Sequence, residues 1–339
     1  GIVLSMFTAL VITKYIMNAF YALGVKDVKW YGVAKDRTPI NFLSKKNIFF
    51  GLSIAVIVAG FVVMGINKAN TGDMLNYSLE FKGGTATTVT FNESMSLEEA
   101  TATVVPVIEQ VTGSAVQVQN VQESNEIIFK TNSLNVEQRE ALNAALIENF
   151  GVSEDMITSE TISSTISDEM KSDTIIAVVV AIVCMLIYIR IRFKDLRFGV
   201  SSIAALVHDV LVVLAFYAAA KVSVGNTFIA CMLTIVGYSV NATIVIFDRV
   251  RENMAVMSRK DDLQDVVNKS ITQTLTRSIF TSLTTFIMVA CLYVLGVTSI
   301  RDFALPLMVG IVCGAYSSVC ITGALWYVLR QKFPPKTAK

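Results

Sequence analysis

The sequence predicts a polytopic α-helical membrane protein that carries one α+β domain outside the membrane. The first observation is composition: 53% of the 339 residues are hydrophobic, 16% are charged, and the mean hydropathy is +0.59. These values are far from those of a soluble domain. The second is a series of seven long apolar stretches, and the third is a polar, acidic stretch, residues 67–172, between the second and third of them.

The apolar stretches predict seven membrane spans. About 20 apolar residues cross the roughly 30 Å of hydrocarbon in a bilayer. The predicted spans are residues 1–23, 48–66, 174–189, 198–220, 227–247, 278–297 and 303–329, of which 174–189 is short and needs its flanks. Because the first span opens without a basic segment or a cleavage-site pattern, we expect the chain to be a fragment.

The charges predict the orientation in the membrane. Lys and Arg gather in four connections, residues 24–46, 190–197, 249–269 and 330–339. By the positive-inside rule these face the cytoplasm, and so does the C-terminus. The other side receives residues 67–173 and tight turns near Lys221 and Arg301. Because 16 Asp or Glu stand against 4 Lys or Arg between residues 67 and 170, the external domain is predicted to be acidic.

The chain shows no pattern typical of an enzyme. All five cysteines lie in predicted spans, so we expect no disulfide in the external domain. No nucleophile arrangement, phosphate-binding loop or metal cluster is recognisable, and we expect no cofactor and no metal. The basic clusters lack interleaved aromatic residues, which favours lipid contacts over nucleic acid.

The external domain is predicted to alternate strands and helices. A strand or tight pair is expected at residues 77–91, and further strands at 115–121, 127–130 and 156–166, with a turn at 122–126. One helix runs from Ser96, which with Glu99 has the spacing of a capping box, to about Val111; another runs from Asn135 to Gly151. The order β-α-β-β-α-β predicts a ferredoxin-like split unit.

The first and last spans resemble each other. Three short groups match at a constant offset, namely Gly1-Ile2-Val3, Phe7-Thr8 and Ile12-Thr13 with Gly310-Ile311-Val312, Tyr316-Ser317 and Ile321-Thr322. The match predicts a duplicated protein whose first half ends with residues 1–23.

Polar residues interrupt the span at residues 227–247 and continue into a charged segment. Gly237-Tyr238-Ser239-Val240-Asn241 is followed by Phe247-Asp248-Arg249-Val250-Arg251-Glu252-Asn253. With Phe81-Lys82-Gly83-Gly84-Thr85 in the external domain and Leu275-Thr276-Arg277-Ser278 near the next span, these motifs resemble the SecF family over residues 46–332. Residues 1–23 resemble the last span of SecD, as in single-chain SecDF proteins.

The resemblance implies an RND-like six-helix unit plus one extra helix. It divides the chain into the last SecD-like helix (1–23), a cytoplasmic linker (24–46), the first SecF-like helix (47–66), the ferredoxin-like domain (67–172), five further helices (173–330) with a cytoplasmic loop (248–276), and a tail (331–339). It further implies late, proton-driven preprotein export across the cell membrane, and as partners the SecD-like half, the SecY, SecE and SecG channel, SecA, the unfolded preprotein and membrane lipid.

Asp209 and His208 are the leading candidates for a proton path. Asp209 lies roughly 16 Å from the start of its predicted helix, near mid-membrane, where a carboxylate needs a partner or a proton. The alternative is an acid that only joins helices. A free imidazole titrates near neutrality, which suits proton exchange, but a neighbour on a helix points about 100° away, so we expect His208 to make an interhelical hydrogen bond instead.

Two further candidates depend on the resemblance. The family's functional arginine corresponds to Arg277, for which snorkelling to lipid is the ordinary alternative. SecF sequences commonly carry aspartate after the motif asparagine, whereas here Ala242 follows Asn241, which cannot release a proton. The coupling acid is therefore Asp209 or an acid in the SecD half, of which we favour the second, or else this half is structural. Sodium stays open as the ion, because Ser239, Asn241 and Thr243 offer oxygen ligands.

The remaining motif residues have structural alternatives. Asp248, Arg249, Arg251 and Glu252 form either a helix-end ion network or a cytoplasmic hinge, and Asn253 completes the family motif. Phe81, Gly83 and Gly84 are expected to serve the backbone, through a turn or close approach. An extended chain is expected to bind an external strand edge that the sequence does not locate. An RND-type exporter of lipid or small molecules and a passive scaffold are the alternative functions.

Overall fold

The computed structural model describes residues 2–31, 38–120, 125–192, 195–258, 261–296 and 298–334. Parts of the predicted linker (32–37), of the strand and turn at 115–126 (121–124) and of the tail (335–339) lie outside the described residues. The chain forms two compact units, Gly1–Thr38 and Pro39–Lys339. In the first, α1 (Ile2–Phe7), the π-helical turn η1 (Thr8–Ile12) and α2 (Thr13–Ala22) follow one another, and the 3-10 turn η2 (Val28–Tyr31) comes after them.

Within the described residues, the second unit contains six helices that are long and apolar enough to cross a membrane. They are Leu43–Thr71 (η3, Leu43–Lys45, and α3, Lys46–Thr71), α8 (Ser164–Arg192), α9 (Leu196–Ala220), α10 (Asn226–Ala255), α11 (Leu263–Leu295) and Ile300–Lys332, the last formed by α12 (Thr298–Tyr316), η5 (Ser317–Thr322) and α13 (Gly323–Lys332). These confirm six of the seven predicted spans. The prediction for residues 1–23 is not confirmed, because that stretch is helical but is not among the six described spans.

Several helices continue beyond the predicted spans. α8 begins at Ser164, inside the predicted last strand, and α3 ends only at Thr71. α10 and α11 also occupy most of the predicted loop 248–276 and leave only residues 256–262 between them. The predictions were too short because hydropathy marks the lipid-crossing part of a helix, whereas the backbone stays helical until a residue such as Gly72, with a φ of 81°, ends it.

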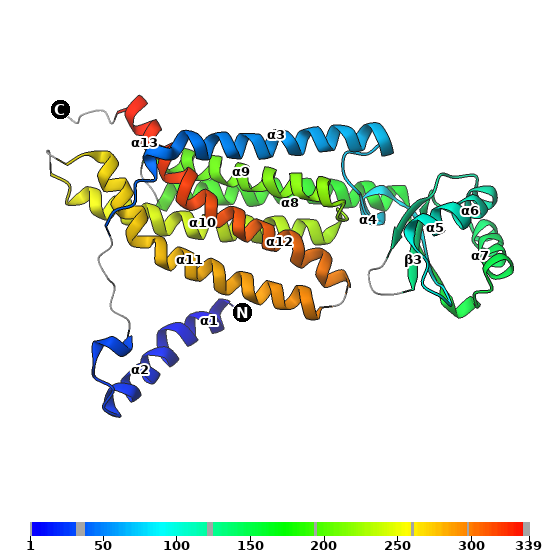
Figure 1. The fold of residues 1–339 in the computed structure, drawn as a ribbon, viewed down its shortest axis with the longest axis horizontal. Coiled ribbons are helices and arrows are strands. Elements are labelled where there is room, and N and C mark those ends of the chain that lie inside the picture. The colour runs from blue at the N-terminus through cyan, green and yellow to red at the C-terminus, as the bar shows by residue number, and fades with distance from the viewer. Residues whose placement is uncertain are drawn as a thin grey trace. The chain divides into compact units, whose positions relative to one another are not determined.

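α9 lies at the centre of the bundle, where it packs against α3, α10 and α12 (Figure 1). At one end of the bundle the aromatic ring of Phe198 stacks on Trp326, with 4.9 Å between ring centroids, and meets Phe247 edge-on at 4.7 Å. This cluster also buries Leu43 from the segment before α3. Asn268 on α11 holds that segment by accepting hydrogen bonds from the backbone N–H groups of Phe42 and Leu43 at 3.0 and 3.2 Å.

The external domain is an antiparallel sheet with helices on one face. Its elements are α4 (Leu79–Lys82), β1 (Gly84–Thr90), α5 (Leu97–Thr103), α6 (Val105–Thr112), β2 (Gln117–Asn120), β3 (Glu126–Thr131), α7 (Val136–Phe150), η4 (Glu154–Met156) and β4 (Ile157–Ile162). The strand order is β2-β3-β1-β4, and all neighbours are antiparallel. β3 thus lies between the two strands that α5 and α6 connect, as in a split βαβ unit.

The helix caps of the external domain have the expected geometry, whereas one predicted strand residue, Phe81, is helical. Asn135 and Gln138 form a capping box, and Gly151 ends α7 with a φ of 62°. Ser96 accepts a hydrogen bond from the N–H of Glu99. The prediction of a strand at Phe81 is wrong: Phe81 lies in the short helix α4 and is buried among bundle residues, since an aromatic ring there fills the core between domain and bundle.

The glycines after α4 permit close backbone approach. A Cβ on Gly84, whose φ is 121°, would lie 2.3 Å from the carbonyl oxygen of Thr131 on β3. Gly83 has a φ of 71° and lies beside Ser164 at the start of α8. Both observations agree with a backbone role for the pair.

The external domain is joined to the outer end of the bundle through main-chain hydrogen bonds. The N–H of Ser78 donates to the carbonyl of Val224 at 2.9 Å, and the N–H of Val224 donates to the carbonyl of Asn76 at 2.8 Å. The first amide of α10, on Asn226, donates to the Glu80 carboxylate at 2.7 Å. A carboxylate at a helix N-terminus is favoured by the helix dipole, so Glu80 stabilises this junction.

Candidate functional site

Asp209 lies on the buried side of α9 and is 1% exposed, while His208 beside it is 8% exposed. Ser201, Ser202, Ala205 and Val213 on the same helix are also buried, at the spacing of one helical face. Asp209 is thus enclosed by protein groups within the bundle. Its charge or proton must therefore be stabilised by protein groups.

Four side chains contact the Asp209 carboxylate, and together with it they form the buried carboxylate centre. Ser239 of α10 and Ser317 of η5 donate hydrogen bonds to Oδ2 at 2.5 and 2.8 Å. His208 Nδ1 lies 2.9 Å from Oδ1, and the Cys313 thiol of α12 donates to Oδ1 over 3.2 Å. The centre connects α9, α10 and α12, so it can fix three helices together and also hold a proton among several oxygen, nitrogen and sulfur atoms.

The expectation for His208 was partly wrong. Its ring does not point away from Asp209, because the long imidazole side chain turns back along the helix to the neighbouring carboxylate. Across helices, Nδ1 lies 3.9 Å from Cys313 Sγ. Cys313 and Ser317 were not among the predicted site residues, and the only sequence signal for them was a run of small polar residues inside an apolar span.

Two backbone features bring α12 and η5 close to the centre. A Cβ on Gly310 would lie 2.3 Å from Ile235 Cδ1, so glycine allows α12 to approach α10. One helical turn beyond Cys313, the backbone widens to the π-helical turn η5, which begins at Ser317. π-Helical turns often occur at functional sites because they change the direction of side chains.

A second polar region, the lateral pocket, lies between α10 and α11. Its volume is about 70 Å³, and the residues that line it include Tyr238, Asn241, Arg277, Ser278 and Ser282. Tyr238 donates to Ser282 at 2.8 Å, whereas the buried Ser278 hydroxyl has no hydrogen-bond partner among the described residues. Arg277 and Asn241 are exposed side chains. The structure therefore brings these two candidates to one pocket but separates them from Asp209.

The three proposed sodium ligands do not lie together. Ser239 and Thr243 are buried on one face of α10, while Asn241 is exposed on the opposite face. Residues two apart on a helix differ by about 200°, so one ion cannot reach all three side chains. Ala242 also lines the lateral pocket, which puts the expected acid position there rather than at the buried carboxylate centre.

The charged motif after this span forms ion pairs within and between helices. Asp248 pairs with Arg192 of α8 at 2.5 Å and with Arg251 at 3.4 Å, and Arg249 pairs with Glu252 at 2.9 Å. Asn253 donates to Ser270 and Gln273 of α11 at 2.8 and 2.9 Å. The motif thus links α8, α10 and α11, in agreement with a helix-end network.

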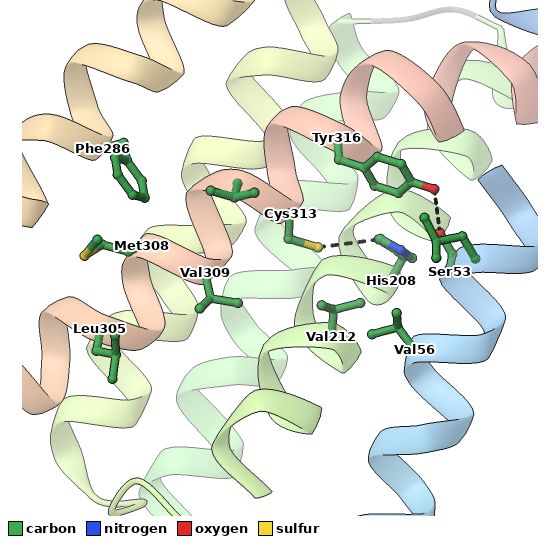
Figure 2. Close-up of a pocket in the computed structure, with 12 residues that line it drawn as sticks. Ser53, Val56, His208, Val212, Phe286, Leu305, Met308, Val309, Cys313 and Tyr316 are labelled. Atoms are coloured by element: carbon green, nitrogen blue, oxygen red, sulfur yellow. Dashed lines mark hydrogen bonds between the residues drawn. The ribbon is translucent and has the colours of Figure 1, made fainter. Parts of the chain in front are cut away.

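An apolar cavity of about 570 Å³ lies beside the buried carboxylate centre. Figure 2 shows His208, Val212 and Val56 on one side of it and Val309, Leu305 and Phe286 on the other. The hydroxyls of Ser53 and Tyr316 lie 3.3 Å apart at its edge. His208 and Cys313 therefore separate an apolar space from the polar centre.

The buried carboxylate centre contains the types of side-chain atom that bind metal ions. His208, Asp209 and Cys313 offer ligand atoms within 4.8 Å of one another, although no metal was expected. Such donors suit Zn²⁺. In this structure, however, the same atoms contact one another at hydrogen-bond distances, and Oδ2 is occupied by Ser239 and Ser317.

Six spanning helices around a buried carboxylate, with an α+β domain between the first and second, define a polytopic helical membrane protein with one external domain. Residues 143–332 match the family described as "Protein export membrane protein SecD/SecF, C-terminal". The chain belongs to this SecD/SecF family.

Individual relatives match most of the chain. The SecF subunit of Alicyclobacillus acidocaldarius is 34% identical over 293 residues, which are 86% of this chain and 93% of the relative. SecF of Vibrio alginolyticus is 31% identical and covers 91% of this chain and 97% of its own length. The crystal structure of SecDF from Thermus thermophilus matches 88% of this chain with a TM-score of 0.75 and 31% identity; the match spans 40% of that SecDF chain.

Proposed function

We propose that the chain is the SecF-type part of a Sec protein-export machine that uses the proton gradient to promote late translocation of preproteins. Family membership and the names of its relatives, protein translocase subunits SecF and SecDF, support the export role. The observation that carries the proton role is the His208–Asp209 pair of α9, buried mid-span with hydrogen-bond partners from two other spanning helices. A carboxyl group bonded to an imidazole places two groups that can each take up or release a proton within hydrogen-bond distance of each other.

In this proposal the chain works with a SecD half, the SecY, SecE and SecG channel, and SecA. The basic connections and the C-terminus face the cytoplasm, as the positive-inside rule predicts. The acidic domain then lies where the preprotein leaves the channel. SecF sequences commonly carry an aspartate after the motif asparagine, whereas here Ala242 follows Asn241, so we place the principal coupling acid in the SecD half. His208 and Asp209 are the proton-exchanging pair of this half, and their contacts also hold α9, α10 and α12 together.

A passive scaffold without ion coupling is the second candidate. Ala242 and the exposed, uncharged Asn241 favour it, because neither can release a proton in the lateral pocket. In a scaffold, the buried carboxylate centre would stabilise the bundle and do nothing else.

The test uses inverted membrane vesicles that contain this chain, a SecD half and an active Sec channel. Release of a translocating precursor is measured with and without an imposed proton gradient, for the parent protein, Asp209→Asn and Arg277→Ala. We expect gradient-stimulated release in the parent protein, and partial stimulation in Asp209→Asn at equal protein level. Complete loss in Asp209→Asn would instead place the coupling acid in this chain, and equal release with and without the gradient in the parent protein would favour the scaffold.

A further inference from the structure

The external sheet has one face that its own helices leave uncovered. α5, α6 and α7 lie on the side of the sheet away from the bundle (Figure 1). Successive strand residues point to opposite faces. Val89 and Phe129 are buried in the core under the helices, whereas Ala86, Thr88 and Ile128 line a hollow of about 470 Å³ between the sheet and the outer end of the bundle.

The hollow has an apolar and hydroxyl-rich floor made from two rows of paired residues. Strand register places Ile128, Thr88 and Thr158 side by side in one row, and Lys130, Ala86 and Glu160 in the next. Ser223, Gly225 and Thr227 beside the start of α10 line the hollow from the bundle. Hydroxyls can donate to or accept from a peptide main chain, while Ile128 and Ala86 offer apolar contact.

The charges of the hollow favour a cationic occupant. Among the described residues that line the hollow, Glu80, Glu160 and Asp302 contribute three carboxylates against the one ammonium group of Lys130. Lys130 donates to Gln119 at 2.9 Å, and burial lowers its pKa, with the Asp302 carboxylate acting in the opposite direction. Glu80 is engaged at the first amide of α10, and the charges of Asp302 and Lys130 act on each other, which leaves Glu160 as the lining carboxylate with neither contact.

We propose that this hollow binds an extended segment of polypeptide that carries Lys or Arg. The inference rests on the proposed export function and assigns the substrate contact to the open sheet face rather than to a strand edge. An extended chain rises about 3.3 Å per residue, so roughly four residues cross the ~14 Å between the outer strands of a four-stranded sheet. The volume also lies within the range of ordinary binding cavities.

Site-specific crosslinking tests the assignment, since the external domain contains no native cysteine. Thr88→Cys and Thr158→Cys place a thiol in the hollow, and Glu148→Cys places one on the exposed side of α7 as the matched control. The three variants, with the unmodified parent as background for the cysteines in the spans, are assembled with a SecD half and an active channel. A precursor stalled during translocation, with a short lysine-bearing segment outside the channel, is the probe.

We expect crosslinks from the two hollow positions and none above background from Glu148→Cys. Replacing the precursor lysines with glutamine, or introducing Glu160→Gln with Asp302→Asn, is expected to lower the yield several-fold. Equal yields from all three positions, or crosslinks to the SecD half in place of the precursor, would overturn the assignment. Gradient-stimulated release in the same vesicles reports separately on the proposed export function, which stands if release persists and only the crosslinks fail.

Discussion

The two polar regions of the bundle differ in how their groups are bonded. In the buried carboxylate centre, Asp209 receives hydrogen bonds from Ser239, Ser317 and Cys313 and contacts His208. In the lateral pocket, Asn241 and Arg277 are exposed. α10 serves both, because Ser239 faces one region and Asn241 the other. Polar residues of one motif therefore have different roles. The Ser239 face of α10 contributes to packing within the bundle, and the Asn241 face is accessible to a partner or to lipid.

The largest effect is expected from Asp209→Ala. The substitution leaves buried donors on two other helices without an acceptor, so we expect the free energy of unfolding to fall by about 3–5 kcal/mol. Asn241→Ala, in the lateral pocket, should stay within about 0.5 kcal/mol of the parent. Denaturant unfolding in detergent micelles measures both. Similar losses for the two variants would contradict the distinction between the regions.

Ser317→Ala is expected to have the next largest effect. It removes one hydrogen bond to the carboxylate, and bonds to a charged group contribute about 1.5–3 kcal/mol. The adjacent Ser318 is the control, because its hydroxyl donates only to a carbonyl of its own helix, that of Ala315. Thermal unfolding of Ser317→Ala and Ser318→Ala, side by side, measures the difference in stability. A larger loss of stability in Ser318→Ala would show that the hydrogen bond to the carboxylate is not the main contribution of η5.

Gly310→Ala tests the close approach of α12 to α10. The added methyl group would overlap Ile235, at a cost of about 1–3 kcal/mol in unfolding free energy. Gly237→Ala on the exposed face is the control, since no atom lies within 4 Å of its Cβ position. Adding Ile235→Ala to Gly310→Ala removes the overlapping Cδ1 and Cγ1 atoms, which lie 2.3 and 2.4 Å from the added Cβ, and should recover part of the loss; no recovery would mean that the overlap is not the cause.

Tyr238→Phe is expected to have the smallest effect. It removes the hydrogen bond to Ser282 in the lateral pocket, which should lower the free energy of unfolding by about 0.5–1.5 kcal/mol. The effect should shrink to nothing in a Ser282→Ala background, which a double-mutant cycle of unfolding free energies measures. An additive cycle would show that the two hydroxyls do not interact.

The sequence predicted the membrane class and the order of the external elements because both depend on local signals. Apolar length marks a span wherever it occurs, and Asn135 caps its helix through residues only three positions away. Phe81 was misassigned because its helical conformation depends on burial against Val224 and Tyr217, which lie more than a hundred residues further along the chain.

The candidate site was predictable only in part for the same reason. Asp209 is conspicuous as an acid in an apolar span, but its partners Ser317 and Cys313 come from another helix and carry no charge. Asn241 and Ser239 look equivalent in the motif, and only the rotation of α10 in the bundle separates the buried face from the exposed one. No pattern within one helix sets that rotation.

The π-helical turns have a consequence for the ancestry of the chain. η1 begins at Thr8 and η5 at Ser317, positions that also match in the resemblance of the first and last spans. In each turn, a threonine five residues on, Thr13 or Thr322, donates to the first carbonyl, at 3.1 and 3.0 Å. A π-helical turn amounts to one extra residue in a helix, which shifts all later side chains by about 100°. The predicted duplication would account for this likeness, because a copied gene segment that already held the extra residue would give both helices the same shift in phase.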